Sequence, residues 1–193
     1  MRIRTEDVCQ PACRMPVINN PTLYLPEHGL LAAVNYCDAR KDTRVFLVDV
    51  ERLTASSYPV PDDQHGAYGF AHGSDGNLYL GFFGGALYRF DMTARTCARV
   101  AHPFPDRLTW GGGASRAGRI YMGVYPTGEF CEYDIATGAC RTFAPMPRDP
   151  TLGFYARGFV ELPDGRIVVY IDGGRTATGA DAVEWAKQVD SFG

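Results

Sequence analysis

The sequence has few lysines and no block of basic residues. Lysine and arginine together number 19 against 22 aspartates and glutamates, and Lys41 and Lys187 are the only lysines. The net charge at pH 7 is −3, and no stretch of the sequence forms a stripe of basic residues. Nucleic-acid-binding domains normally carry such a stripe, so we expect no nucleic-acid partner.

Long apolar runs are missing as well. No apolar stretch approaches the roughly 18 residues that a membrane-spanning helix needs, so we expect no membrane association. Residues 1–7 carry charges where a secretory signal peptide has its apolar segment. We therefore expect a cytoplasmic protein, unless the chain lacks its original N-terminus, in which case the compartment is unknown.

Several motifs that would indicate a cofactor are not found. The chain has no Gly-x-Gly-x-x-Gly, no phosphate-binding loop and no pair of histidines at metal-ligand spacing. Cys9 and Cys13 form a C-x3-C pair with no second pair and no nearby histidine. We identify no cofactor, predict no metal site, and find no support for a divalent metal.

Glycine, proline and aromatic residues, by contrast, are plentiful. The chain has 22 glycines, 13 prolines and 12% aromatics, and 46% of its residues are hydrophobic. This hydrophobic content excludes a disordered chain. Many glycines and prolines among aromatic residues favour short strands joined by tight turns over a helical bundle.

The chain also repeats itself. Residues 69–81 align without gaps with residues 111–123 and residues 158–170, and a fainter copy occupies residues 22–34. The turn glycines of the four copies are separated by 47, 42 and 47 residues: Gly29, Gly76, Gly118 and Gly165. Two further strand patterns follow the complete copies, and an aspartate begins the turn between them. Four strands in 42 to 47 residues are typical of a β-propeller blade.

We therefore predict an all-β fold, a partial β-propeller of four-stranded antiparallel blades with a short C-terminal amphipathic helix. The predicted segments are an N-terminal arm (1–20), a propeller region (21–175) with blades at about 21–62, 64–105 and 106–148 and an incomplete one at 155–172, and a helical tail (176–193). The helix is predicted from apolar residues at 182, 183, 186 and 189.

The repeat resembles the propellers of the streptogramin-lyase-like group and its quinoprotein-like and six-bladed lactonase-like relatives. The resemblance covers about residues 20–175 and lies in Gly-x-x-x-Gly-x-Asp-Gly-x-Leu-Tyr-x-Gly, at residues 69–81, and in Tyr-Asp-x-x-Thr-Gly, at residues 133–138. The gluconolactonase-like relatives open with a metal-binding glutamate in Glu-Gly-Pro. This sequence has Asn19-Asn20-Pro21 instead, so their metal site is not carried over.

About three and a half blades do not close a ring, and three explanations remain open. The chain is a fragment of a larger propeller, a half-propeller that pairs with itself, or a small ring closed by its N-terminal segment. Open sheet edges favour association. The predicted partners are therefore the missing blades or a second copy, together with a small-molecule or carbohydrate ligand.

One repeat position indicates where that ligand binds. The residue before the first glycine of each copy varies among large side chains: Pro21, Tyr68, Trp110 and Arg157. In a propeller this position lies at one mouth of the ring. We predict ligand-binding roles for Tyr68, Trp110, His102 and Arg107, and catalytic roles, if the protein is an enzyme, for His65, Tyr155 and Arg157. His72 and Glu161 share a repeat position at the opposite end and are not nominated.

Two function classes follow from this pattern. The first is a non-catalytic propeller that binds a ligand or serves as a scaffold. The second is a lyase that performs β-elimination on a carbohydrate or cyclic-peptide-like ligand, as the resemblance implies. An arginine, a tyrosine and a histidine could hold a carboxylate, stabilise an enolate and move a proton. The sequence leaves open whether the protein is an enzyme.

Overall fold

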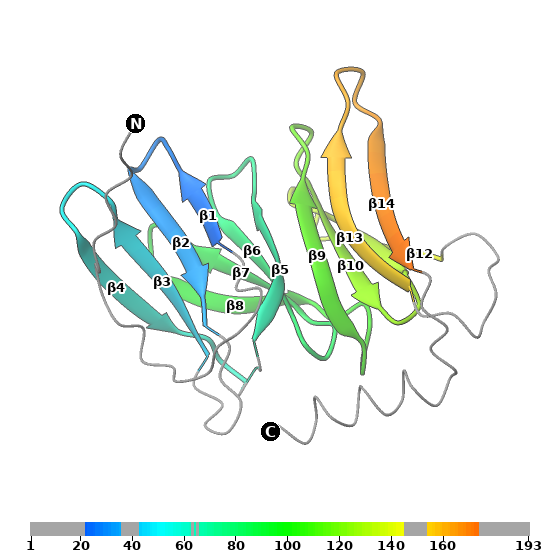
Figure 1. Ribbon diagram of the computed structural model, residues 1–193, viewed down its shortest axis with the longest axis horizontal. Helices are drawn as coiled ribbons and strands as arrows, with labels where there is room; N and C mark the ends of the chain where they lie inside the picture. The colour runs from blue at the N-terminus through cyan, green and yellow to red at the C-terminus, as the bar shows by residue number, and fades with distance from the viewer. Residues whose placement is uncertain (1–21, 36–42, 63, 65, 145–153, 174–193) are drawn as a thin grey trace.

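The computed structural model contains strands and turns in every part that it describes, which is residues 22–35, 43–62, 64, 66–144 and 154–173 (Figure 1). Over these ranges the chain forms no helix. The same ranges contain no helical segment with the length and hydrophobicity that crossing a membrane requires. The predicted helix falls at 176–193 and lies outside these ranges.

Fourteen strands form three four-stranded antiparallel sheets and one two-stranded sheet, which we call blades 1 to 4. Blade 1 contains β1 (Thr22–Leu25), β2 (Leu30–Val34), β3 (Arg44–Asp49) and β4 (Thr54–Pro59). Blade 2 contains β5 (Ala67–His72), β6 (Leu78–Phe82), β7 (Leu87–Asp91) and β8 (Thr96–Ala101). Blade 3 contains β9 (Leu108–Ala114), β10 (Arg119–Tyr125), β11 (Phe130–Asp134) and β12 (Cys140–Phe143). Blade 4 contains β13 (Phe154–Glu161) and β14 (Ile167–Gly173).

The predicted all-β fold of antiparallel blades is confirmed, and each full blade pairs its strands in chain order. The fainter first copy needs one correction. Leu31 and Leu78 are equivalent, since each lies two residues after the turn glycine, but Leu31 pairs with Tyr24 across six residues whereas Leu78 pairs with His72 across five. The β1–β2 connection is therefore one residue longer than the β5–β6 connection. Tyr24 therefore corresponds to His72, and Leu25 corresponds to Gly73. In a strand a shift of one residue exchanges the two faces, so this correction decides which side chains of β1 face blade 2.

Aspartates at equivalent positions fix the hairpin between the third and fourth strands. In each full blade one carboxylate oxygen accepts two backbone N–H groups of the following turn: Asp49 from Glu51 and Arg52, Asp91 from Thr93 and Ala94, and Asp134 from Ala136 and Thr137. Such bonds satisfy backbone N–H groups of the turn that have no partner on a paired strand. The same local chemistry is thus repeated three times.

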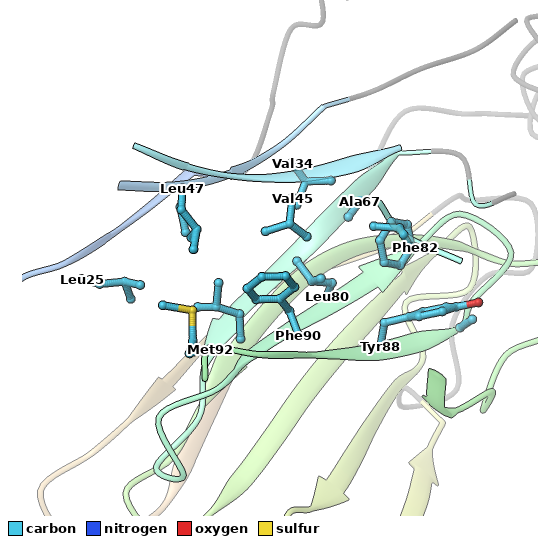
Figure 2. Close-up of a cluster of buried hydrophobic side chains, with 14 residues drawn as sticks. Leu25, Val34, Val45, Leu47, Ala67, Leu80, Phe82, Tyr88, Phe90 and Met92 are labelled. Atoms are coloured by element: carbon cyan, nitrogen blue, oxygen red, sulfur yellow. The ribbon is translucent and has the colours of Figure 1, made fainter. Parts of the chain in front are cut away.

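Two apolar cores lie between the blades. The first joins blade 1 to blade 2 and includes Leu25, Val34, Leu80 and Phe90, all at most 1% exposed. Figure 2 shows these side chains between the two facing sheets. The second core joins blade 2 to blade 3 through residues such as Tyr79, Met122 and Cys131. Apolar burial between neighbouring blades therefore helps to hold the array together.

Each first strand lies beside the first strand of the next blade: β5 contacts both β1 and β9, and β9 contacts β13. Glycines allow the backbones to come this close. A Cβ atom at Gly69 would lie 2.9 Å from the Gly111 carbonyl oxygen, and one at Gly111 would overlap the Arg157 carbonyl oxygen. The first strands therefore form the inner wall of the array.

The Asp91 turn leads to a prediction about pH. Hydrogen bonds from the backbone of Ala94 and Thr93, and the nearby Arg89 guanidinium, hold the pKa of Asp91 below its ordinary value. A lowered folded-state pKa contributes stability above the unfolded-state pKa, near 3.8, and that contribution is lost as the pH falls through the folded-state value. The Asp91→Asn variant should therefore be less stable than the wild type at pH 7, and the difference should shrink in acid.

Chemical denaturation of both proteins between neutral pH and about pH 3 measures this difference. Asp106→Asn is the matched control, because it removes the same charge from an exposed turn that also has a positive φ. If the difference in unfolding free energy between the wild type and Asp91→Asn stays constant with pH, the charge of the Asp91 carboxylate does not stabilise the turn.

Candidate functional site

Three β-bulges, one in each of three inner strands, mark the candidate site. The register of β5 with β6 skips Tyr68, that of β9 with β10 skips Trp110, and that of β13 with β14 skips Arg157. A bulge inserts one residue into a strand and turns its side chain away from the ordinary alternation. The variable position of the repeat is thus the bulge residue of each inner strand, at the end where the strand begins.

The aromatic side chains at this end form one connected cluster. The Trp110 ring lies 4.8 Å from that of Tyr68, nearly parallel to it, and 5.0 Å from that of Tyr155. Tyr125, from the end of β10, stacks on Tyr155 at 4.2 Å. Phe83, just after β6, lies 4.9 Å from Tyr68. We call these five residues the aromatic cluster, and Trp110 is at its centre.

Arg157 supplies the positive charge of the site. Its guanidinium carbon lies 4.7 Å from the centre of the Tyr155 ring and 5.8 Å from that of Trp110. At these distances the ring faces attract the cation and hold the side chain over the cluster. Arg157 is exposed, whereas Tyr68, Trp110 and Tyr155 are half-buried. The structure therefore brings together four of the seven predicted site residues.

Burial also affects the chemistry of Tyr68. Desolvation raises the pKa of its hydroxyl above the ordinary value of 10.0. The hydroxyl therefore stays protonated at neutral pH and can both donate and accept a hydrogen bond. It is suited to binding a polar group and unsuited to acting as a base.

The other predicted residues are placed differently. His65 lies outside the residues that the structure describes. His102 and Arg107 belong to the β8–β9 loop and contact the loops between second and third strands. The His102 Nε2 lies 2.8 Å from the Gly84 carbonyl oxygen, to which it can only donate. The Arg107 Nε lies 4.0 Å from a carboxylate oxygen of Glu129. Both residues thus have partners within the protein.

The opposite end of the inner strands contains an open cleft of about 490 Å³. Its ionisable lining residues are Glu27, His28, His72, Arg116 and Glu161. Glu27 lies 3.4 Å from the His72 Nδ1, and Glu161 accepts hydrogen bonds from the backbone and side chain of Arg116 at 2.9 and 3.0 Å. The bond from the Arg116 backbone lowers the pKa of Glu161. These carboxylates are therefore paired within the protein.

None of the residues that line this cleft was predicted as a site residue, although the repeat gave a signal for it. His72 and Glu161 share one repeat position, and both line the cleft. Tyr125 and Phe83 were also missed, because nothing in their sequence context shows that their strands end beside the bulges. Among the described residues, no three histidine, cysteine, aspartate or glutamate side chains are grouped so that they could hold a metal ion.

Comparison with solved structures places this arrangement among β-propellers. A streptogramin B lyase superimposes with a TM-score of 0.62 at 13% identity, over 81% of this chain and 54% of that protein. The virginiamycin B lyase of Staphylococcus aureus gives 0.56 at 12% identity, over 77% and 54%. An auxiliary nutrient binding protein of Bacteroides thetaiotaomicron gives 0.56 at 15% identity, over 79% and 37%.

The chain thus spans about half the length of the two lyases it matches. No protein-family model matches the sequence. At identities this low the similarity shows a shared fold and does not carry an activity with it. The similarity to streptogramin lyase propellers that the repeat suggested is confirmed at the level of the fold.

Proposed function

We propose that this chain is a ligand-binding propeller module and that the aromatic cluster with Arg157 binds a carbohydrate bearing a carboxylate. One observation supports this most: equivalent bulges direct three chemically different side chains, Tyr68, Trp110 and Arg157, into one group. Repeated positions with only a structural role would carry similar residues. A solved propeller described as a nutrient binding protein shows that the fold serves such a role elsewhere.

The chemistry of the group fits this ligand class. The faces of Trp110 and Tyr155 offer flat apolar surface, on which the C–H face of a sugar ring can stack. The Arg157 guanidinium presents paired N–H donors that match the two oxygens of a carboxylate. The rings are already packed against one another, so little side-chain entropy remains to be lost on binding.

Isothermal titration calorimetry with a short oligogalacturonate and its neutral galactose counterpart tests the proposal. The charged ligand should bind more tightly than the neutral one. Arg157→Gln should weaken binding of the charged ligand about tenfold, the range of a lost charge-assisted hydrogen bond, and change binding of the neutral ligand little. Arg95→Gln is the matched control, because Arg95 also lies over a tyrosine, Tyr58, at 6.0 Å.

Equal affinity for both ligands, or equal losses in the two arginine variants, would contradict the role of Arg157. A titration with no heat from either ligand would contradict the carbohydrate class itself.

A β-eliminating lyase is the second candidate, supported by the Tyr155 ring that lies directly beneath Arg157. In such a reaction a base removes the proton next to the carboxylate, the bond to the leaving oxygen breaks, and a carbon–carbon double bond forms. Arginine would stabilise the enolate, and a tyrosine hydroxyl would protonate the leaving oxygen. Incubation with oligogalacturonate should then raise ultraviolet absorbance, and Tyr155→Phe should abolish the rise. Binding without any rise would leave the non-catalytic function.

A further inference from the structure

The face of blade 4 that points away from blade 3 is apolar and exposed. It carries Gly158, Val160, Val168 and Tyr170, which lie on one side of the sheet because Gly158 pairs with Tyr170 and Val160 with Val168. Val160 and Tyr170 are each 60% exposed and Val168 is 48% exposed. We call these four residues the trailing face.

In blade 3 the equivalent residues are Gly111, Gly113, Tyr121 and Gly123, and blade 4 covers all of them. A Cβ atom at Gly113 would lie 2.7 Å from the Phe159 Cβ, and one at Gly123 would lie 2.5 Å from the Ala156 Cβ. The Tyr121 ring stacks on Phe159 at 5.6 Å. In blade 2 the equivalent residues contact blade 3 in the same way, as Tyr79 does with Tyr133. The trailing face is therefore the kind of surface that receives the next blade.

Blade 1 has the opposite kind of surface. Its side away from blade 2 carries five residues, which we call the leading face: Tyr24, Leu31, Ala33, Phe46 and Val48. The equivalent residues of blade 2 pack against blade 1, among them Leu80 and Phe90, which are fully buried. On the leading face Tyr24 is 51% exposed and the other four are half-buried.

Residue sizes on the two faces are complementary. Between blades 2 and 3 a small residue faces a large one, since a Cβ at Gly81 would lie 2.6 Å from the Met122 sulfur. Tyr170 occupies the position of Gly81, and Ala33 occupies that of Met122. The large residue of the trailing face would thus face the small residue of the leading face, and volume across the junction would be conserved.

We propose that the trailing face of one chain binds the leading face of a second copy. Each copy spans about half of the matched lyase propellers, so two copies supply the length of one ring. In a dimer whose two-fold axis coincides with the axis of the ring, two such junctions form, and both the trailing face and the leading face of each copy are covered. A second copy of the chain carries the complementary face, and it is present wherever the first copy is.

Sedimentation velocity of the whole chain across the micromolar range tests this pairing. We expect a dimer that dissociates on dilution. Tyr24→Glu and Tyr170→Glu should each weaken dimerisation by about tenfold or more, because each buries an unpaired charge in both junctions. Thr96→Glu is the control, because it places the same charge on the outermost strand of an internal blade.

Mixing the two variants distinguishes head-to-tail packing from contacts between like faces. A mixed dimer has one junction with both substitutions and one that is native, so the mixture should associate more tightly than either variant alone. Circular dichroism should show that both variants keep the fold, since Tyr24 and Tyr170 are exposed in the single chain. A monomer at every concentration, an effect of only one of the two variants, or no recovery on mixing would overturn the proposal.

Discussion

Replacing Gly111 by alanine should lower the free energy of unfolding by about 3 kcal/mol, the upper part of the range for overpacking a core. The new Cβ would overlap the carbonyl oxygen of Arg157 and approach that of Ala156, both backbone atoms of the neighbouring inner strand. Backbone atoms cannot rotate away as side chains do, so blades 3 and 4 would have to separate. Urea denaturation measures the loss.

Gly158→Ala is the matched control for this substitution. Gly158 occupies the same repeat position in blade 4, but a Cβ there would meet only the Tyr170 Cβ, at 3.5 Å. The change should stay within about 0.5 kcal/mol, as is usual for an open surface. Both variants are best made in the Tyr170→Glu chain, so that self-association does not contribute. Equal losses of unfolding free energy in Gly111→Ala and Gly158→Ala would contradict direct stacking of the inner strands.

Replacing Trp110 by alanine should weaken binding of oligogalacturonate about 30-fold or more, which corresponds to a binding hot spot. Trp110 contacts Tyr68, Tyr125 and Tyr155 and lies beneath Arg157, so its loss removes the stacking surface and the support of the guanidinium together. Trp110→Phe should retain part of the affinity. Calorimetry on each variant provides the measurement.

Tyr58→Ala controls for the loss of any aromatic ring. Tyr58 also takes part in a ring pair, 5.4 Å from Phe90, and also lies beneath an arginine, but it belongs to the outermost strand of blade 1. This variant should bind the ligand as the wild type does. If Trp110→Ala unfolds the chain in a thermal melt, Trp110→Phe still tests the site, because it keeps an aromatic ring at the bulge.

The turns and the repeat were predictable because their chemistry is local. Asp134 and Gly138 fix a hairpin with atoms a few residues away, and a repeat of such hairpins already specifies a blade. The comparison of copies also selected Tyr68, Trp110 and Arg157. The bulges that bring these residues together were missed, although each bulge residue directly precedes a strand glycine, Gly69, Gly111 or Gly158, and such a glycine often marks a bulge.

Other features depended on the pairing of strands or on contacts between blades and were missed for that reason. The one-residue difference in the first turn exchanges the faces of Tyr24 and Leu25, and only the register of β1 with β2 shows which one is buried. Similarly, Glu27 and His72 are distant in sequence and meet only because blades 1 and 2 stack. Local patterns specify the blade, and packing between blades specifies the sites.

The emission of Trp110 during a titration tests the proposed binding site most directly. The chain has two tryptophans, Trp110 and Trp185, so the Trp185→Phe variant reports on the aromatic cluster alone. Oligogalacturonate should change this emission saturably, with the same concentration dependence as the calorimetric heat. Heat of binding with unchanged Trp110 emission would place the ligand elsewhere, for example in the cleft at the opposite end of the inner strands, and would contradict the bulge residues as the binding site.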